Sequence, residues 1–128
     1  MTTHEEYVDS RRREAALIAA QVIGGSMGYV EGARLVVDAL RDADIDNDDL
    51  DLEALICLDS ETDALPAGHT TALWSDAALR RLAPDLERAA RYGQQHFKVH
   101  FESIVRRFGP SNQPLNPDAP PNGGEPIS

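Results

Sequence analysis

The chain has 128 residues, enough for one domain with a hydrophobic core and too few for two. Hydrophobic residues make up 41% of the sequence but aromatic residues only 5%, a balance that favours helices over sheets. The single cysteine excludes an internal disulfide and is typical of a reducing compartment. No apolar run is long enough to span a bilayer, and residues 1–13 lack the apolar stretch of a secretory signal, so we expect a cytoplasmic protein.

The formal net charge of −10 is concentrated in one segment. Residues 38–63 hold eleven acids and one base, Arg41, so this segment alone carries a charge of −10. Residues 80–107 have the opposite balance, with seven bases and three acids. Such an uneven field repels nucleic acid and anionic membranes from the acidic side and attracts cations or a basic protein. The alternative is a solvated acidic surface that only keeps the protein in solution.

The first predicted helix covers residues 3–23. Thr3 and Glu6 match a capping box, and apolar residues become more frequent toward residue 23. The Gly24-Gly25 pair then interrupts the pattern, as glycines do at helix ends.

A second helix is expected from Ser26, a good cap, to about residue 40, with apolar residues three and four apart on one face. Gly32 lies within that face and predicts a close helix crossing. After an acidic connection, Asp48 or Asp49 can cap a third helix. A strand is the alternative for residues 55–58, because that apolar run is short.

Residues 65–68, Leu-Pro-Ala-Gly, are predicted to end the third element. Ser75 is a suitable cap for a short helix over residues 77–82, and Pro84 is suited to start a further helix that runs to about Phe108. The sequence therefore predicts an all-α fold, a small bundle of four to five helices, in a domain of residues 1–108.

Residues 109–128 differ from the rest in composition. They include six prolines and three glycines, and only Leu115 and Ile127 are large and apolar. Such a segment buries too little surface to offset its ordering entropy, so we expect a disordered tail.

The acidic connection partly matches a calcium-binding loop. Ligand positions one, three, five and twelve of the EF-hand pattern fall on acids: Asp42, Asp44, Asp46 and Glu53. Position six, usually glycine, is Asn47, and position eight, usually aliphatic, is Asp49. These departures make helix capping in an acidic connection the preferred interpretation, with a calcium-responsive module as the alternative.

Other candidates for chemistry are weaker. His96 and His100 share a helix face and would form a zinc site with Glu102 or with a carboxylate from the acidic segment, whereas histidines on an amphipathic helix usually pack at the core edge. Cys57 lies in an apolar run and is predicted to be buried rather than reactive. We therefore expect no enzyme and no cofactor.

The segment from Asp59 to Gly68, followed by Trp74, is the most distinctive in the chain. It reads Ser-Glu-Thr-Asp, then Leu-Pro, a glycine and the tryptophan. This pattern resembles a motif of a family of small uncharacterised bacterial helical proteins, and residues 31–33 are similar to that family's second-helix signature. The resemblance covers residues 12–108 and implies a mostly helical domain with no established activity. Where the family often has an arginine before the tryptophan, this chain has residues 70–72, Thr-Thr-Ala.

The motif also has a structural interpretation. Ser60 or Asp63 can bond local backbone at a helix end, Pro66 ends the helix, and Trp74 packs the loop onto the core. The alternative is a small-molecule or enzyme site centred on residues 59–69, in which the acids would do acid–base chemistry.

Our main functional hypothesis is a non-catalytic acidic module that binds a basic protein, such as an immunity or antitoxin-type inhibitor of a basic bacterial toxin or enzyme. No nucleic acid or membrane is expected as a partner. The expected binding residues are nine acids and one aromatic: Asp42, Asp44, Asp46, Asp48, Asp49, Asp51, Asp59, Glu61, Asp63 and Trp74. The acids would steer association, with Trp74 or Tyr29 as an apolar anchor.

Overall fold

The computed structural model describes residues 3–109 and, within them, all side chains except those of residues 68–70. All regular structure in this part of the chain is helical, which confirms the predicted all-α bundle. The elements are α1 (His4–Ile23), α2 (Tyr29–Asp42), α3 (Leu50–Glu61), the short 3₁₀ helix η1 (Gly68–Leu73) and α4 (Asp76–Phe108). Of the predicted tail, residues 110–128 lie outside the described residues.

Three predicted caps begin their helices as expected. The Thr3 hydroxyl accepts a hydrogen bond from the Glu6 amide at 3.0 Å, and the Glu6 carboxylate accepts one from the Thr3 amide at 2.9 Å, which confirms the capping box. The Asp49 carboxylate caps α3, and the Ser75 hydroxyl accepts from the Ala78 amide at 3.1 Å to cap α4.

Two local predictions are wrong, and one alternative is excluded. Ser26 does not cap α2, which begins at Tyr29 without a side-chain cap; its hydroxyl instead donates to the Gln21 carbonyl at the end of α1. The third element is a helix throughout, as predicted, which excludes the alternative of a strand over residues 55–58. Pro84 does not start a helix but lies inside α4, where its exposed position lets water reach the backbone group that loses its helical partner.

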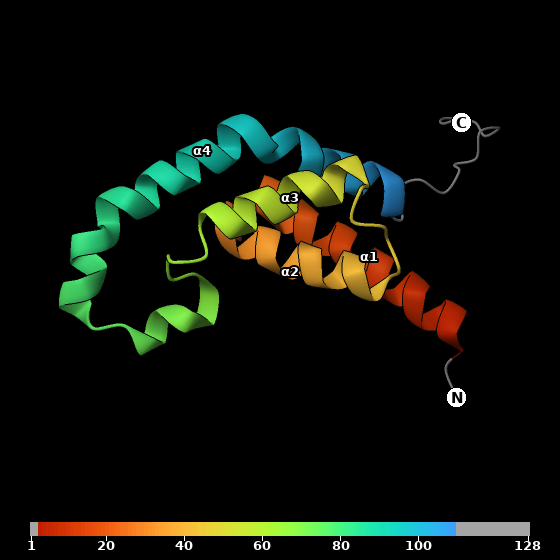
Figure 1. The fold of residues 1–128 in the computed structure, drawn as a ribbon, viewed down its shortest axis with the longest axis horizontal. Helices are drawn as coiled ribbons and strands as arrows, with labels where there is room; N and C mark the ends of the chain where they lie inside the picture. The colour runs from red at the N-terminus through yellow and green to blue at the C-terminus, as the bar shows by residue number, and fades with distance from the viewer. Residues whose placement is uncertain (1–2, 110–128) are drawn as a thin grey trace, which may run out of the picture.

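The core lies between α1, α2, α3 and the C-terminal half of α4 (Figure 1). Its largest fully buried side chains come from all four helices: Val22, Val36, Val37, Leu40, Leu52, Leu55, Leu58, Phe101 and Ile104. Gly32 allows the predicted close crossing, because a Cβ there would lie 2.1 Å from Val22 Cγ2 on α1. Gly93 does the same for α4, since its Cβ would lie 2.6 Å from Tyr29 Cβ.

Helix α4 has two different halves. From Ala89 onward it contributes buried residues to the bundle, whereas residues 76–88, which we call the arm, contain none. Figure 1 shows the arm leaving the bundle on the side of η1. None of the helices within residues 3–109 combines the length and apolarity needed to cross a membrane.

Candidate functional site

Two of the acids predicted to bind a partner are already paired inside the protein. Arg107 of α4 bonds both Asp49 oxygens, at 3.0 and 2.6 Å, and Asp51 Oδ2 at 2.8 Å. Asp51 is only 8% exposed, and it also accepts from Ser103 Oγ at 2.6 Å and contacts His100 Nδ1 at 2.9 Å. Asp51 therefore joins α3 to α4 and does not present its carboxylate to a partner.

These contacts shift the pKa values of the acids. The hydrogen bond from Arg107 holds the pKa of Asp49 below its usual value of 3.8, with further help from the amides that Asp49 caps. Burial by itself would raise the pKa of Asp51, but hydrogen bonds from Ser103, His100 and Arg107 together lower it. Both groups are therefore charged in the folded protein at neutral pH.

The serine, histidine and aspartate of this cluster do not form a nucleophile. In a catalytic triad the histidine removes the proton from the serine hydroxyl, so the two side chains must be hydrogen-bonded to each other. Here the Ser103 hydroxyl donates to Asp51, and His100 contacts the other oxygen of the same carboxylate. The cluster thus provides hydrogen-bond partners for the buried carboxylate of Asp51.

The alternative of a calcium-binding loop is not supported by the contacts of its acids. Asp42 pairs with Arg11 of α1 at 3.0 Å, and Asp44 contacts His4 Nε2 at 2.9 Å. The described side chains include no group of three His, Cys, Asp or Glu residues that could hold a metal ion. The geometry of the described residues therefore supports neither the calcium alternative nor the zinc alternative on α4.

The Ser-Glu-Thr-Asp segment forms a turn that Arg34 of α2 holds in place. The Arg34 guanidinium donates to the carbonyls of Thr62 at 2.5 Å and Leu65 at 3.0 Å, and it pairs with Asp59 at 3.3 Å. The Thr62 hydroxyl donates to the Leu58 carbonyl at 2.7 Å, and Pro66 is buried. These contacts favour a structural role for the motif.

Among the described side chains, Glu61 and Asp63 do not line the pocket found nearby, and the side chains of residues 68–70 lie outside the described part. Glu61 hydrogen-bonds Tyr92, which raises the pKa of that phenol, while Asp63 is exposed. A shallow pocket of about 180 Å³ nearby is lined by Tyr29, Glu31 and Pro66 and by neither of the two acids. Its lining thus leaves out the acids on which the predicted acid–base site depended.

Two further predictions in this region are wrong. Trp74 is 38% exposed and does not pack its loop onto the core. Cys57 is exposed on α3 and not buried, because it lies on the side of the helix opposite Leu55 and Leu58.

Two of the predicted binding acids, Asp46 and Asp48, lie together with Glu53 where α3 begins. Leu50 is 76% exposed, and the exposed carboxylates of Asp46, Asp48 and Glu53 lie within four residues of it along the chain. None of the three carboxylates forms an ion pair with a described side chain. We call these four residues the acidic end, and they are the candidate binding surface.

Sequence reasoning missed the cations that pair with the acids. His100, Ser103 and Arg107 are spaced three and four apart, so they form a polar stripe beside the apolar face of α4. That spacing was the available signal that an acid on another helix would face them. Leu50 was missed because a single leucine between aspartates gives no periodic pattern. No protein-family model, curated protein sequence or solved structure matches the chain.

Proposed function

We propose that the protein is a non-catalytic binding module whose acidic end docks onto a basic protein. The observation that carries the proposal is an exposed leucine, Leu50, flanked along the chain by exposed carboxylates that form no ion pair with a described side chain. A single exposed leucine is ordinary, but interfaces typically combine an apolar centre with a charged rim. The partner should therefore present a small apolar recess bordered by arginines or lysines.

The two kinds of residue would have different roles. Asp46, Asp48 and Glu53 would speed association by steering a positive surface toward the acidic end. Leu50 would slow dissociation, because a buried apolar side chain contributes mainly after contact is made. We infer an inhibitor of the immunity or antitoxin type acting in the cytoplasm on a basic bacterial toxin or enzyme. Membership of the bacterial family that the Ser-Glu-Thr-Asp motif resembles is part of the same proposal.

The test captures proteins on the immobilised full chain from an extract of the cells that express it. A captured protein is identified by mass spectrometry, purified, and its association and dissociation rates are measured. We expect a basic protein that binds at one chain each and associates more slowly as salt is added. If the captured protein is an enzyme, its activity should fall as the complex forms.

Variants of the acidic end make the test specific. D46N/D48N should slow association about 10-fold, while L50A should speed dissociation with little effect on association. E31Q/D63N removes the same amount of charge elsewhere and should leave both rates nearly unchanged. Capture that is insensitive to salt and equal for all variants would overturn the proposal.

A further inference from the structure

The arm has no net charge, with three acids and three bases in residues 76–88, but two adjacent arginines near its start give it a local cationic patch. Arg80 and Arg81 are exposed, and neither forms an ion pair with a described side chain. Immediately before α4, Leu73 is 84% exposed and Trp74 is 38% exposed. We call these four residues the tip of the arm. It combines two cations with two apolar side chains, and one exposed acid, Asp76, lies between them along the chain.

The tip and the acidic end match in both charge and hydrophobicity. The acidic end has three carboxylates around one leucine, and the tip has two guanidinium groups beside a leucine and a tryptophan. Contact would pair the exposed charges of both surfaces and cover Leu50, Leu73 and Trp74. Such double complementarity is what specific interfaces use to fix partner and register.

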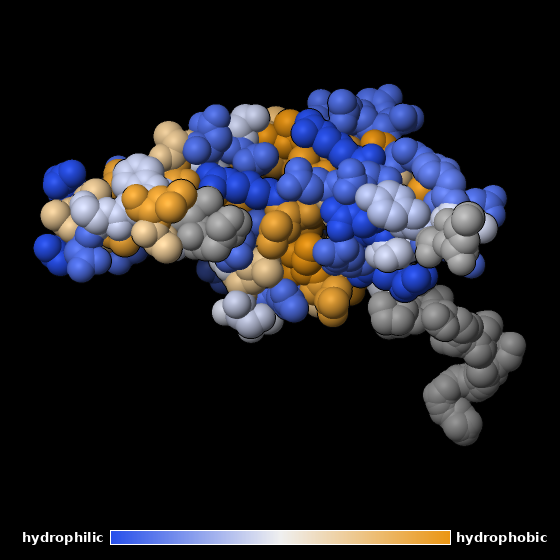
Figure 2. Space-filling model, turned by 90° about the horizontal axis from the view of Figure 1, so that it is seen from below, coloured by the Kyte–Doolittle hydropathy of each residue, from blue (hydrophilic) through white to orange (hydrophobic). Residues whose placement is uncertain are grey.

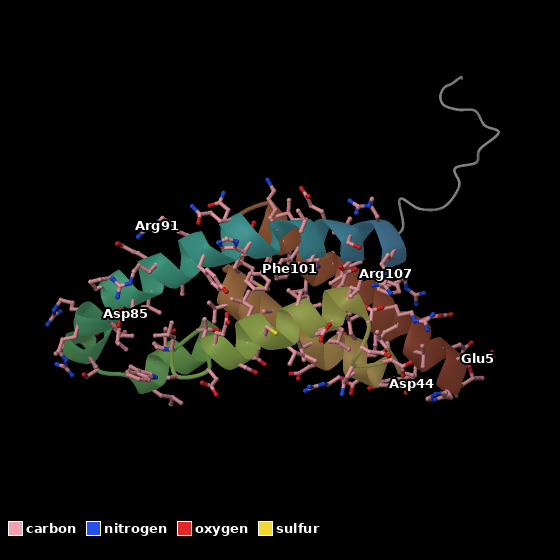
Figure 3. All side chains as sticks on the ribbon, turned by 45° about the horizontal axis from the view of Figure 1, so that its top comes forward. Glu5, Asp44, Asp85, Arg91, Phe101 and Arg107 are labelled. Atoms are coloured by element: carbon pink, nitrogen blue, oxygen red, sulfur yellow. The ribbon has the colours of Figure 1, made fainter. Side chains whose placement is uncertain are left out.

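The two surfaces lie at opposite ends of the molecule. Helix α3 begins at the acidic end and runs for roughly 18 Å toward the side where the arm leaves the bundle. Figure 1 shows the arm at one side and the connection between α2 and α3 at the other, and Figure 3 places Asp85 toward the first side and Asp44 toward the second. Figure 2 shows the molecule from below relative to Figure 1. Hydrophilic residues cover much of its right-hand end, while the projecting left end mixes hydrophilic and apolar residues. One chain therefore cannot bring its own tip to its own acidic end.

We propose that two copies of this chain form an antiparallel dimer in which the tip of each arm contacts the acidic end of the other copy. A twofold axis makes both contacts identical and closes the assembly, so one pair of surfaces is used twice. The net charge of −10 on each copy opposes association at long range. At 0.15 M salt this repulsion is screened beyond about 8 Å, so the charges that lie in contact determine whether the two copies associate.

The dimer is independent of the proposed function, because it requires only this chain. The dimer would also compete with the proposed partner, since a basic protein would have to displace the tip from the acidic end before it could bind there. The two ideas can fail separately: the dimer is tested with the pure protein, and the partner by capture from cells.

The test uses charge reversal and mixing of the full chain. Variant R80E/R81E makes the tip acidic, and variant D46K/D48K makes the acidic end basic. Each variant alone opposes like charges at both contacts, so its dimer dissociation constant should rise about 100-fold or more. An equimolar mixture of the two restores opposite charges at both contacts and should form a mixed dimer. Sedimentation equilibrium gives the masses, and circular dichroism checks that each variant is folded.

The control and a local readout complete the test. E31K/D63K changes the net charge as much as D46K/D48K does and should leave the dimer intact. Trp74 is the only tryptophan, so its emission should shift to shorter wavelength when the wild type, but neither charge-reversed variant, is concentrated. The proposal would be overturned by a wild type that stays monomeric at about 200 µM. It would also be overturned if either charge-reversed variant kept its dimer, or if the mixture of the two variants stayed monomeric.

Discussion

Gly32 shows how one absent methyl group sets the distance between two helices. A Cβ at this position would lie 2.1 Å from Val22 Cγ2, and Val22 is itself almost fully buried. The side chain of Val22 cannot turn away without displacing other core residues. The intrinsic advantage of alanine in a helix, about 1 kcal/mol, is therefore outweighed by overpacking.

We expect Gly32→Ala to lower the free energy of unfolding by about 2 kcal/mol, measured by urea denaturation. Val22→Ala also destabilises the fold, because it leaves a cavity. The double variant V22A/G32A should lose less than the sum of the two single losses, since each change relieves the other. Strictly additive losses would mean that the two side chains are not in conflict.

At the scale of elements, Pro84 gives the arm and the bundle different stabilities. Proline inside a helix is about 3 kcal/mol less favourable than alanine and removes one backbone hydrogen bond. Here it lies in the part of α4 that contributes no buried residue. The two halves of α4 should consequently open independently of each other.

Pro84→Ala should slow amide hydrogen exchange in residues 76–88, because it restores a backbone donor and favours the helix. The free energy of global unfolding should change by less than about 0.5 kcal/mol, since the arm is not part of the core. Pro84→Gly restores the donor without the propensity and should have a smaller effect on exchange. A large shift of the urea midpoint in either variant would show that the arm contributes to the core.

At the scale of the whole molecule, the cluster around Asp51 makes stability depend on pH. Asp49 and Asp51 have pKa values below the ordinary 3.8, and they face Arg107 and His100 of α4. A lowered pKa in the folded state gives stability that is present above pH 3.8 and is lost as the pH falls through the folded pKa. We therefore expect the free energy of unfolding to decline below about pH 4.

Asp51→Asn keeps the shape of the side chain but cannot ionise. It should cost about 2 kcal/mol at pH 6.5, because Arg107 and Ser103 lose their charged acceptor. Between pH 6.5 and pH 3 it should lose less stability than the wild type. Asp63→Asn, at an exposed acid, is the control, and its pH profile should follow that of the wild type. Parallel profiles for all three proteins would contradict the role of Asp51.

Much of the fold could be predicted because its signals are local. Thr3, Asp49 and Ser75 cap helices through contacts with residues two or three positions away, and such contacts appear directly in sequence. Pro84 misled the prediction, because proline is equally suited to a first turn and tolerable at an exposed interior position. The sequence could not say which of these applied.

The candidate site was less predictable, because pairing between distant residues decides which acids are available. Asp51 and Asp48 look alike in sequence, yet one is buried against Arg107 and the other is exposed. The difference arises from their places in α3. Position 51 lies on the side of the helix that faces α4, whereas position 48 lies before the helix begins. Counting acids indicated a negative surface, but only the packing of α3 on α4 shows which carboxylates remain outside.

The arm has a final consequence for how this protein can change. Because residues 76–88 contain no fully buried residue, core packing constrains substitutions there only weakly. Under the proposed dimer, the contact made by the arm can therefore change through substitutions in residues 76–88 while the bundle stays the same. A graft of a different recognition sequence onto the arm should leave the bundle intact. The protein could therefore serve as a scaffold for new binding specificities.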